Sequence, residues 1–113
     1  MDIHQAAKTG DVGRIQQLLA EEGNPNERDQ HARTPIHLAA WAGHLDVVEE
    51  LVKAEGIQVS ANARDDTNAL HFACQKGHTL IAKRLSANGV NVNSKTRKGM
   101  TPLMLAAQQG TLP

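Results

Sequence analysis

The sequence predicts an all-α solenoid, in which short pairs of helices stack in a single row. The first observation behind this prediction is a motif that recurs along the 113 residues at intervals of 33 or 34 positions. The second is a Thr-Pro pair, a signal for the start of a helix, ahead of two copies of the motif. The third is the composition: aromatic residues make up only 2% of the chain, and alanine recurs at equivalent positions where helices could pack closely.

The motif is clearest around a histidine and a following pair of small residues. Its four copies occupy residues 3–10, 36–43, 70–77 and 103–110. The second residues of the copies are His4, His37, His71 and Met104, which are 33, 34 and 33 positions apart. The middle interval gains its extra residue around positions 53–56. A period of this length indicates stacked units, each of which buries its apolar face against its neighbours.

A short first helix is predicted at the start of each copy. Thr34-Pro35 places Thr at the N-cap and Pro at the first helical position, and Thr101-Pro102 repeats this arrangement. The third copy has Asn68-Ala69 instead, where Asn can still cap but the fixed backbone of Pro is missing. The helix is predicted to stop at a glycine in these three copies, which are Gly43, Gly77 and Gly110.

A second helix is predicted to follow each of the first three. In the second copy its apolar face consists of Leu45, Val47, Val48, Leu51 and Val52. The equivalent helices are predicted from about Val12 to Ala20 and from Thr79 to Ala87. The loops that lead to the next copy carry Asn, Asp, Gly and Pro, as at 23–26, and are predicted to form turns and hairpin fingers.

The segment 34–44, Thr-Pro-Ile-His-Leu-Ala-Ala-Trp-Ala-Gly-His, closely resembles the ankyrin repeat signature, and residues 101–107 match it again with Met104 in place of histidine. The resemblance covers essentially the whole chain and implies a single ankyrin repeat domain over 1–113. It implies short inner helices that line a concave face, longer helices behind them, and fingers between repeats. The implied repeats are three full units and an incomplete fourth, at about 1–33, 34–67, 68–100 and 101–113.

The two ends of the stack are expected to differ. Gln5 and Arg14 stand at positions that are apolar in other copies, which predicts the polar outer face that the end of a solenoid needs. At the other end, the fourth copy has a first helix only. Three leucines are therefore expected to lose part of their covering: Leu103, Leu105 and Leu112. These features predict a native N-terminus near Met1 and a longer parent protein that continues beyond Pro113.

Composition argues against several classes of function. Lys plus Arg and Asp plus Glu each number 12, so the net charge of +0 gives no reason to expect a nucleic-acid binder or a binder of anionic membranes. Cys74 is the only cysteine, which excludes a disulfide within the chain and favours a reducing compartment. No signal peptide or membrane-length apolar stretch is visible, so we expect a protein of the cytoplasm or nucleus.

The histidines do not form a metal-binding pattern. Five of the six occupy two repeated positions: His4, His37 and His71 at one, His44 and His78 at the other. The resemblance implies structural roles for both sets, at the helix cap and at the turn between helices. Cys74 aligns with Ala40 and is expected to be an inert, close-packed residue. No catalytic, phosphate-binding or metal-ligand motif is present, so we expect no catalytic residue, metal or cofactor.

The resemblance implies protein binding, through the fingers and the exposed ends of the inner helices. The candidate residues on inner helices are Lys8, Trp41, Gln75, Lys76 and Gln108, with Gln109 beside the last. The candidates on fingers are Gln30, His31, Arg33, Arg64, Asp65, Arg97, Lys98 and Met100. Basic residues outnumber acidic ones in this set, which favours a partner with an acidic segment.

Trp41 is the candidate of most interest, because Trp is common among residues that dominate binding energy. The alternative is that it packs on the neighbouring repeat for stability. The function we expect is a non-catalytic, monomeric protein-interaction scaffold. A second possibility is a substrate-targeting or regulatory arm of an enzyme whose catalytic domain lies outside these residues. The uneven repeat length and Cys74 argue against a designed scaffold.

Overall fold

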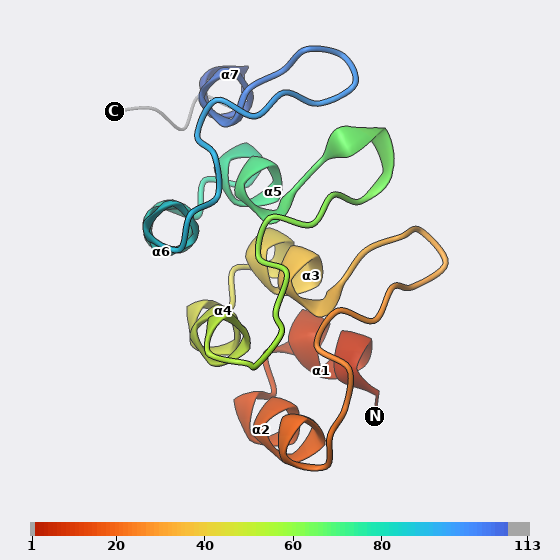
Figure 1. Ribbon diagram of the computed structural model, residues 1–113. Helices are drawn as coiled ribbons and strands as arrows, with labels where there is room; N and C mark the ends of the chain where they lie inside the picture. The colour runs from red at the N-terminus through yellow and green to blue at the C-terminus, as the bar shows by residue number, and fades with distance from the viewer. Residues whose placement is uncertain (1, 109–113) are drawn as a thin grey trace.

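The computed structural model describes residues 2–108, which form two parallel columns of helices (Figure 1). The inner column consists of α1 (Ile3–Thr9), α3 (Pro35–Ala42), α5 (Ala69–Gln75) and α7 (Pro102–Gln108). The outer column consists of α2 (Val12–Ala20), α4 (Leu45–Val52) and α6 (Thr79–Ala87). Helices pack on their neighbours within a column, and each outer helix packs on the inner helix that precedes it. The predicted all-α solenoid is confirmed, and the predicted bounds of α2 and α6 agree with the structure.

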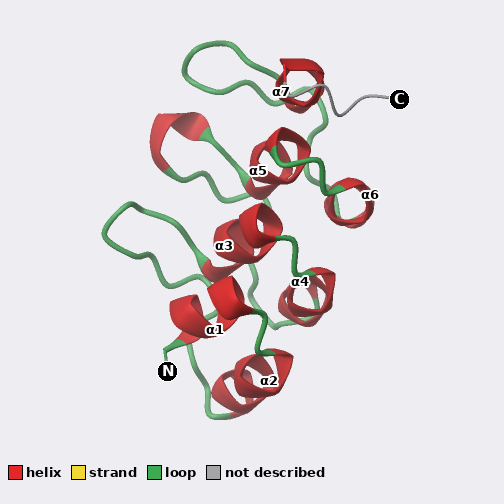
Figure 2. Ribbon diagram, turned by 180° about the vertical axis from the view of Figure 1, so that it is seen from behind, coloured by secondary structure: helices red, strands yellow, loops and turns green. Residues whose placement is uncertain are grey.

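The loops that join one helix pair to the next project from the inner column on the side away from the outer column (Figures 1 and 2). We call their tips finger one (29–33), finger two (63–67) and finger three (96–100). A backbone hydrogen bond closes each finger, from the N–H of its first residue to the carbonyl of its fifth, at 2.8–2.9 Å. Within residues 2–108 no segment forms a strand, so the expected hairpins are tight loops, and finger two contains a short 3₁₀ turn (Arg64–Asp66).

A buried histidine fixes the start of α3 and ties it to the next loop. The backbone N–H of Thr34 donates to Nδ1 of His37 at 2.8 Å, so Nδ1 must be unprotonated. The proton is therefore on Nε2, which donates to the carbonyl of Ala61 at 2.7 Å. The third repeat has the same arrangement, with His71 between the N–H of Asn68 and the carbonyl of Ser94. The structural role expected for this histidine position is confirmed.

The histidines at the second repeated position join neighbouring repeats, and a glycine leaves room for their rings. His44 donates from Nε2 to the carbonyl of Lys8 at 3.1 Å, and His78 donates to that of Trp41 at 3.2 Å. Gly43 ends α3 with a left-handed φ of 87°, and a Cβ added there would lie 2.7 Å from the His78 ring. Glycine is required here both for its backbone conformation and for the space that the imidazole occupies.

Small side chains fill the space between the inner helices, as the composition predicts. Six alanines of the inner column are fully buried: Ala6, Ala7, Ala39, Ala40, Ala69 and Ala73. The larger fully buried side chains come from both columns, for example Ile36 of α3, Leu51 of α4 and Leu85 of α6. Phe72 is only half-buried, and its ring meets that of His37 edge-on at 5.7 Å. The core is thin, and aromatic residues contribute little to it.

The ends of the columns differ, largely as expected. Gln5 is exposed at the N-terminal end. At the other end Leu103 is 62% exposed, although its equivalents Ile36 and Leu70 are buried. The expectation for Leu105 was wrong: it is buried, because its position faces the preceding repeat. Leu112 and Gln109 lie outside the described residues.

Candidate functional site

The candidate residues fall into two rows along the molecule. The inner-helix row lies at the C-terminal ends of the inner helices and comprises Lys8, Trp41, Gln75, Lys76 and Gln108. The finger row comprises Gln30, His31, Arg33, Arg64, Asp65, Arg97, Lys98 and Met100. Gln75, Arg33 and Met100 are half-buried, and the others are exposed. Each row repeats equivalent positions of successive units, so a long partner could contact several units at once.

Trp41 and Lys76 form the only cation–π pair within residues 2–108. The Nζ of Lys76 lies 5.0 Å from the centre of the indole ring, which is close enough for an attraction of about 0.5–1 kcal/mol at an exposed site. Trp41 is 44% exposed and does not belong to the buried core. The contact therefore holds a large ring at the surface, between the second and third repeats.

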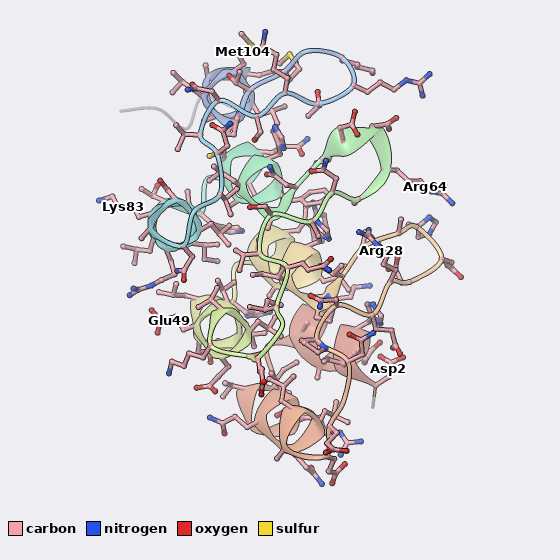
Figure 3. All side chains as sticks on the ribbon, viewed as in Figure 1. Asp2, Arg28, Glu49, Arg64, Lys83 and Met104 are labelled. Carbon is pink, nitrogen blue, oxygen red and sulfur yellow. The ribbon has the colours of Figure 1, made fainter. Side chains whose placement is uncertain are left out.

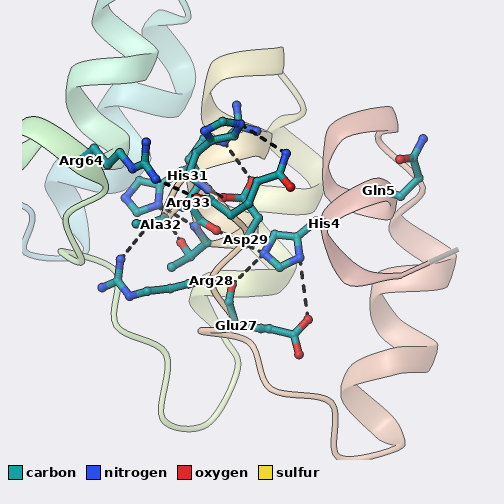
Figure 4. Close-up of polar contacts among 12 residues, drawn as sticks. His4, Gln5, Glu27, Arg28, Asp29, His31, Ala32, Arg33 and Arg64 are labelled. Carbon is teal, nitrogen blue, oxygen red and sulfur yellow. Dashed lines mark hydrogen bonds and ion pairs between the residues drawn. The ribbon is translucent and has the colours of Figure 1, made fainter.

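Finger one is organised by Asp29, which sequence reasoning missed. Its Oδ1 accepts from the backbone N–H of His31 at 2.8 Å and of Arg33 at 2.9 Å, and its Oδ2 accepts from Nε of Arg33 at 3.0 Å (Figure 4). Burial raises the pKa of Asp29, but these hydrogen bonds and the Arg33 charge outweigh that effect and hold the pKa below its ordinary value. The signal that could have revealed it is Asp at the first position of a tight turn, where its side chain bonds the backbone two residues later.

Arginine side chains tie finger one to finger two. Nη1 of Arg28 donates to the carbonyl of Ala32 at 2.8 Å and to that of Asn62, in the next loop, at 2.7 Å. In the opposite direction, Nη2 of Arg64 donates to the carbonyl of Gln30 at 3.0 Å. In Figure 3, Arg28 and Arg64 lie on the side of the molecule where the fingers project. These contacts hold the two fingers in one arrangement before any partner binds, which lowers the entropic cost of binding.

Finger three is joined to finger two by both backbone and side chain. The backbone N–H of Arg97 donates to the carbonyl of Asp65 at 2.8 Å, and Nη1 of Arg97 lies 3.6 Å from Oδ1 of Asp65. Both side chains are largely exposed, so the ion pair itself contributes little stability. Its main effect is to neutralise one charge of the finger row.

Comparison with known proteins now decides the family. The family model for ankyrin repeats, in three copies, matches residues 3–65 and again 55–113. The chain belongs to the ankyrin repeat family. Ankyrin repeats are protein-interaction modules that are generally non-catalytic, and their two-helix units with projecting loops are the units described above.

Several curated ankyrin-containing proteins are similar to the chain. Human inversin is 36% identical over 109 residues, which cover 94% of this chain and 10% of inversin. A putative E3 ubiquitin-protein ligase of Arabidopsis thaliana, XBAT31, is 31% identical, with 95% of this chain and 26% of that protein covered. The Arabidopsis potassium channel SKOR is 30% identical, with 97% of this chain and 17% of the channel covered. The chain thus spans about a tenth to a quarter of the length of these relatives.

The charge on the ankyrin fingers is smaller than the sequence suggests. Arg33 is paired with Asp29 and Arg97 with Asp65. Among residues 2–108, the cations of the two rows that make no ion pair are Lys8, Arg64, Lys76 and Lys98. These four keep a positive charge along the ankyrin surface.

The part of the chain that the structure describes holds no cluster of three or more His, Cys, Asp or Glu side chains suited to a metal ion. None of its helices is both long and apolar enough to cross a membrane. Cys74 is half-buried, whereas a close-packed position was expected for it. Cys74 lines an apolar groove between α5, α6 and α7. Burial still raises the pKa of the Cys74 thiol, which disfavours the reactive thiolate.

Proposed function

We propose that the chain is a non-catalytic scaffold that binds a partner protein with its finger row and its inner-helix row. The observation that carries the proposal is Trp41, a large ring that is 44% exposed and stacked with Lys76 at the surface. Trp is one of the residue types that most often dominate binding energy at protein interfaces. The cross-linked fingers support the proposal, because they offer a surface that needs little reordering.

We further propose that the partner offers an acidic segment. The support is the set of four cations without an ion pair, which lie along both rows. Rim charges of this kind act mainly on the association rate, so rising salt should slow association. Action as a monomer in the cytoplasm or nucleus stays a prediction of this proposal.

Replacing Trp41 by Ala tests the proposal. Proteins captured from a cell lysate by the wild-type chain are identified by mass spectrometry, and their affinity for purified wild type and Trp41→Ala is then measured. We expect the substitution to weaken binding by about tenfold or more, because ring anchors often contribute 2 kcal/mol or more. We expect the melting temperature to stay nearly unchanged, because the ring lies outside the core.

Leu80→Ala is the matched control for this experiment. Leu80 is 66% exposed and belongs to α6 in the outer column, away from both rows. The control should bind like wild type. The proposal would be wrong if Trp41→Ala unfolded the chain at much lower temperature while the folded fraction bound normally, since the ring would then serve stability.

A second candidate is that the chain is the targeting or regulatory arm of an enzyme. The observation in its favour is that the chain covers only 26% of a relative named as a putative ubiquitin ligase. Sequencing the full transcript separates the two candidates. A catalytic motif elsewhere in the same polypeptide would favour the arm, and its absence would favour the scaffold.

A further inference from the structure

Repeats one and two are joined at both ends of their outer helices. At the N-terminal end of α4, Nε2 of His44 donates to the carbonyl of Lys8 at 3.1 Å. At the other end, Asn26 bridges to the loop that follows α4. Its Nδ2 donates to the carbonyl of Gly56, and its Oδ1 accepts from the backbone N–H of Gln58, both at 2.8 Å. Side-chain hydrogen bonds therefore close this boundary on two sides.

Repeats two and three share only the first of these links. Nε2 of His78, at the N-terminal end of α6, donates to the carbonyl of Trp41 at 3.2 Å. At the other end Ser60 stands in the position of Asn26. The Ser60 side chain is exposed and makes no hydrogen bond with the residues that the structure describes. A serine hydroxyl lacks the amide that lets Asn26 donate and accept at once.

The loop that follows α6 keeps the backbone groups that an asparagine could join. Gly89 and Asn91 are the equivalents of Gly56 and Gln58, and both are exposed. Among residues 2–108, no protein group accepts from the backbone N–H of Asn91, so water can satisfy it. The outer loops at the second boundary therefore differ from those at the first by one missing side-chain bridge.

A crevice of about 270 Å³ lies at the same edge, between the C-terminal ends of α4 and α6. Its lining residues are Glu49, Val52, Lys53, Arg84 and Asn88. Nη2 of Arg84 lies 3.0 Å from Oε1 of Glu49, but these side chains are 50% and 38% exposed, so the ion pair contributes little stability. α6 also packs less extensively on α4 than α4 packs on α2. The two helix ends are therefore only weakly held together.

The inner column and the fingers hold the second boundary on its opposite side. α5 packs on α3 nearly as extensively as α3 packs on α1. Nζ of Lys76 lies 5.0 Å from the ring centre of Trp41, and the backbone N–H of Arg97 donates to the carbonyl of Asp65 at 2.8 Å. The boundary is thus fixed at the inner column and loose at the outer loops.

We propose that the boundary between the second and third repeats is a hinge, which turns about the inner column and opens between the C-terminal ends of α4 and α6. Opening there breaks one exposed ion pair and widens a polar crevice. The same movement between the first two repeats would break both hydrogen bonds of Asn26. Because Trp41 and Lys76 lie on opposite sides of the hinge, its movement changes the curvature of the inner-helix row.

Spin labels test the hinge in a chain whose single cysteine is removed by Cys74→Ala. Ala20, Lys53 and Ala87 are equivalent, exposed residues at the C-terminal ends of the outer helices. Cysteine labels at 20 and 53 span the first boundary, and labels at 53 and 87 span the second. Electron paramagnetic resonance gives the distance distribution of each pair. We expect one narrow distance for the first pair and an additional, longer distance for the second.

Ser60→Asn should close the hinge. We expect it to reduce the fraction of the longer distance about tenfold or more, because it supplies two hydrogen bonds that only the closed form makes. Ser60→Ala is the matched control, which supplies no amide and should leave both distributions unchanged. In the reverse experiment, Asn26→Ser should add a longer distance to the first pair.

Two results would overturn the proposal. One is an equally narrow distribution for both pairs in the otherwise unaltered chain. The other is a Ser60→Asn variant that behaves like Ser60→Ala. Circular dichroism confirms that each variant is folded, and Ser60→Asn decides the question alone if Asn26→Ser does not fold.

Discussion

Gly43 and Gly99 share a left-handed backbone but have different surroundings. The φ angle is 87° at Gly43 and 81° at Gly99. A Cβ at Gly43 would lie 2.7 Å from the His78 ring, whereas a Cβ at Gly99 would meet no atom within 4 Å. The two positions therefore separate backbone strain from crowding.

We expect Gly99→Ala to lower the free energy of unfolding by about 1 kcal/mol, the cost of a left-handed backbone for a residue with a Cβ. We expect Gly43→Ala to lower it by about 2 kcal/mol or more, because His78 must also move and lose its bond to the carbonyl of Trp41. Urea denaturation of both variants measures the difference. Equal losses in the free energy of unfolding would show that the His78 imidazole moves aside freely and does not help to hold the repeats together.

At the start of α5, Asn68 and Ala69 stand where α3 and α7 have a Thr-Pro pair. The backbone of Asn68 is extended, with φ of −99° and ψ of 179°, as the residue before a proline requires. Pro35 and Pro102 are buried at the equivalent position, so the space exists.

We expect Ala69→Pro to raise the free energy of unfolding by up to about 1 kcal/mol, because proline restricts the unfolded chain. A thermal unfolding curve checks this, with Pro35→Ala as the reverse control that should destabilise the protein. An unchanged or lower melting temperature for Ala69→Pro would contradict the alignment of the third repeat.

Among the elements, α3 depends on a titratable group for its start and for its link to the next loop. His37 must stay neutral, because its Nδ1 accepts from Thr34 while its Nε2 donates to Ala61. Burial lowers the pKa of His37 from its ordinary 6.5 to about 4, and burial also lowers the pKa of His71. The unfolded chain therefore takes up these protons more readily than the folded chain.

Stability should be unaffected by these histidines above about pH 6.5 and should fall as the pH drops toward 4. For His37 alone the loss amounts to about 3 kcal/mol by pH 4. Denaturation of wild type and of His37→Gln at a series of pH values isolates this contribution, which the variant should lack. His31→Gln, at an exposed finger tip, is the control and should keep the wild-type pH dependence. Parallel curves for wild type and His37→Gln would refute the assignment.

The helices were predictable from the sequence, and the conformation of the fingers was not. The limits of α2 and α6 depend on local caps and on the apolar pattern, both of which are visible in the chain. In finger two, Asp65 and Asp66 have left-handed backbones, and Asp65 is held by Arg97, which is 32 positions away. Contacts between fingers depend on how neighbouring repeats are stacked, and no local pattern encodes that.

The candidate site could likewise be predicted only in part, because its positions follow from the repeat and its contacts do not. The positions of the inner-helix row follow from the repeat, so the exposure of Trp41 could be predicted. Its contact with Lys76 and the neutralisation of Arg33 by Asp29 depend on side-chain geometry that only the structure provides. The sequence shows that Asp29 and Asp65 dilute the positive charge of the finger row, but it does not show which arginines they pair with.

As a whole molecule, the chain is a linear stack 39 Å long, in which each repeat is stabilised mainly by its neighbours. α3 packs against α1, α4 and α5, whereas α7 packs mainly against α5. Stability should therefore be highest in the middle of the stack and lowest at α7.

We expect amide hydrogen exchange in the 113-residue chain to be slowest in α3 and α4 and fastest among the helices in α7. Exchange followed by mass spectrometry gives the order directly. Uniform exchange along all helices would show that the stack unfolds as one cooperative unit.

The hydrogen bonds made by the buried and inter-repeat histidines have a mechanical consequence. His37 and His71 bond to carbonyls 24 and 23 positions later, within their own repeats. His44 and His78 bond to carbonyls 36 and 37 positions earlier, so each of these two closes a long loop across a repeat boundary. Force applied to the two ends of the chain would load these boundaries in series, and a boundary that broke would release roughly one repeat, about 110 Å of extended chain. The released length exceeds the folded length of 39 Å. Under force the molecule should therefore lengthen in discrete steps, each of which begins when the histidine hydrogen bond at one repeat boundary breaks.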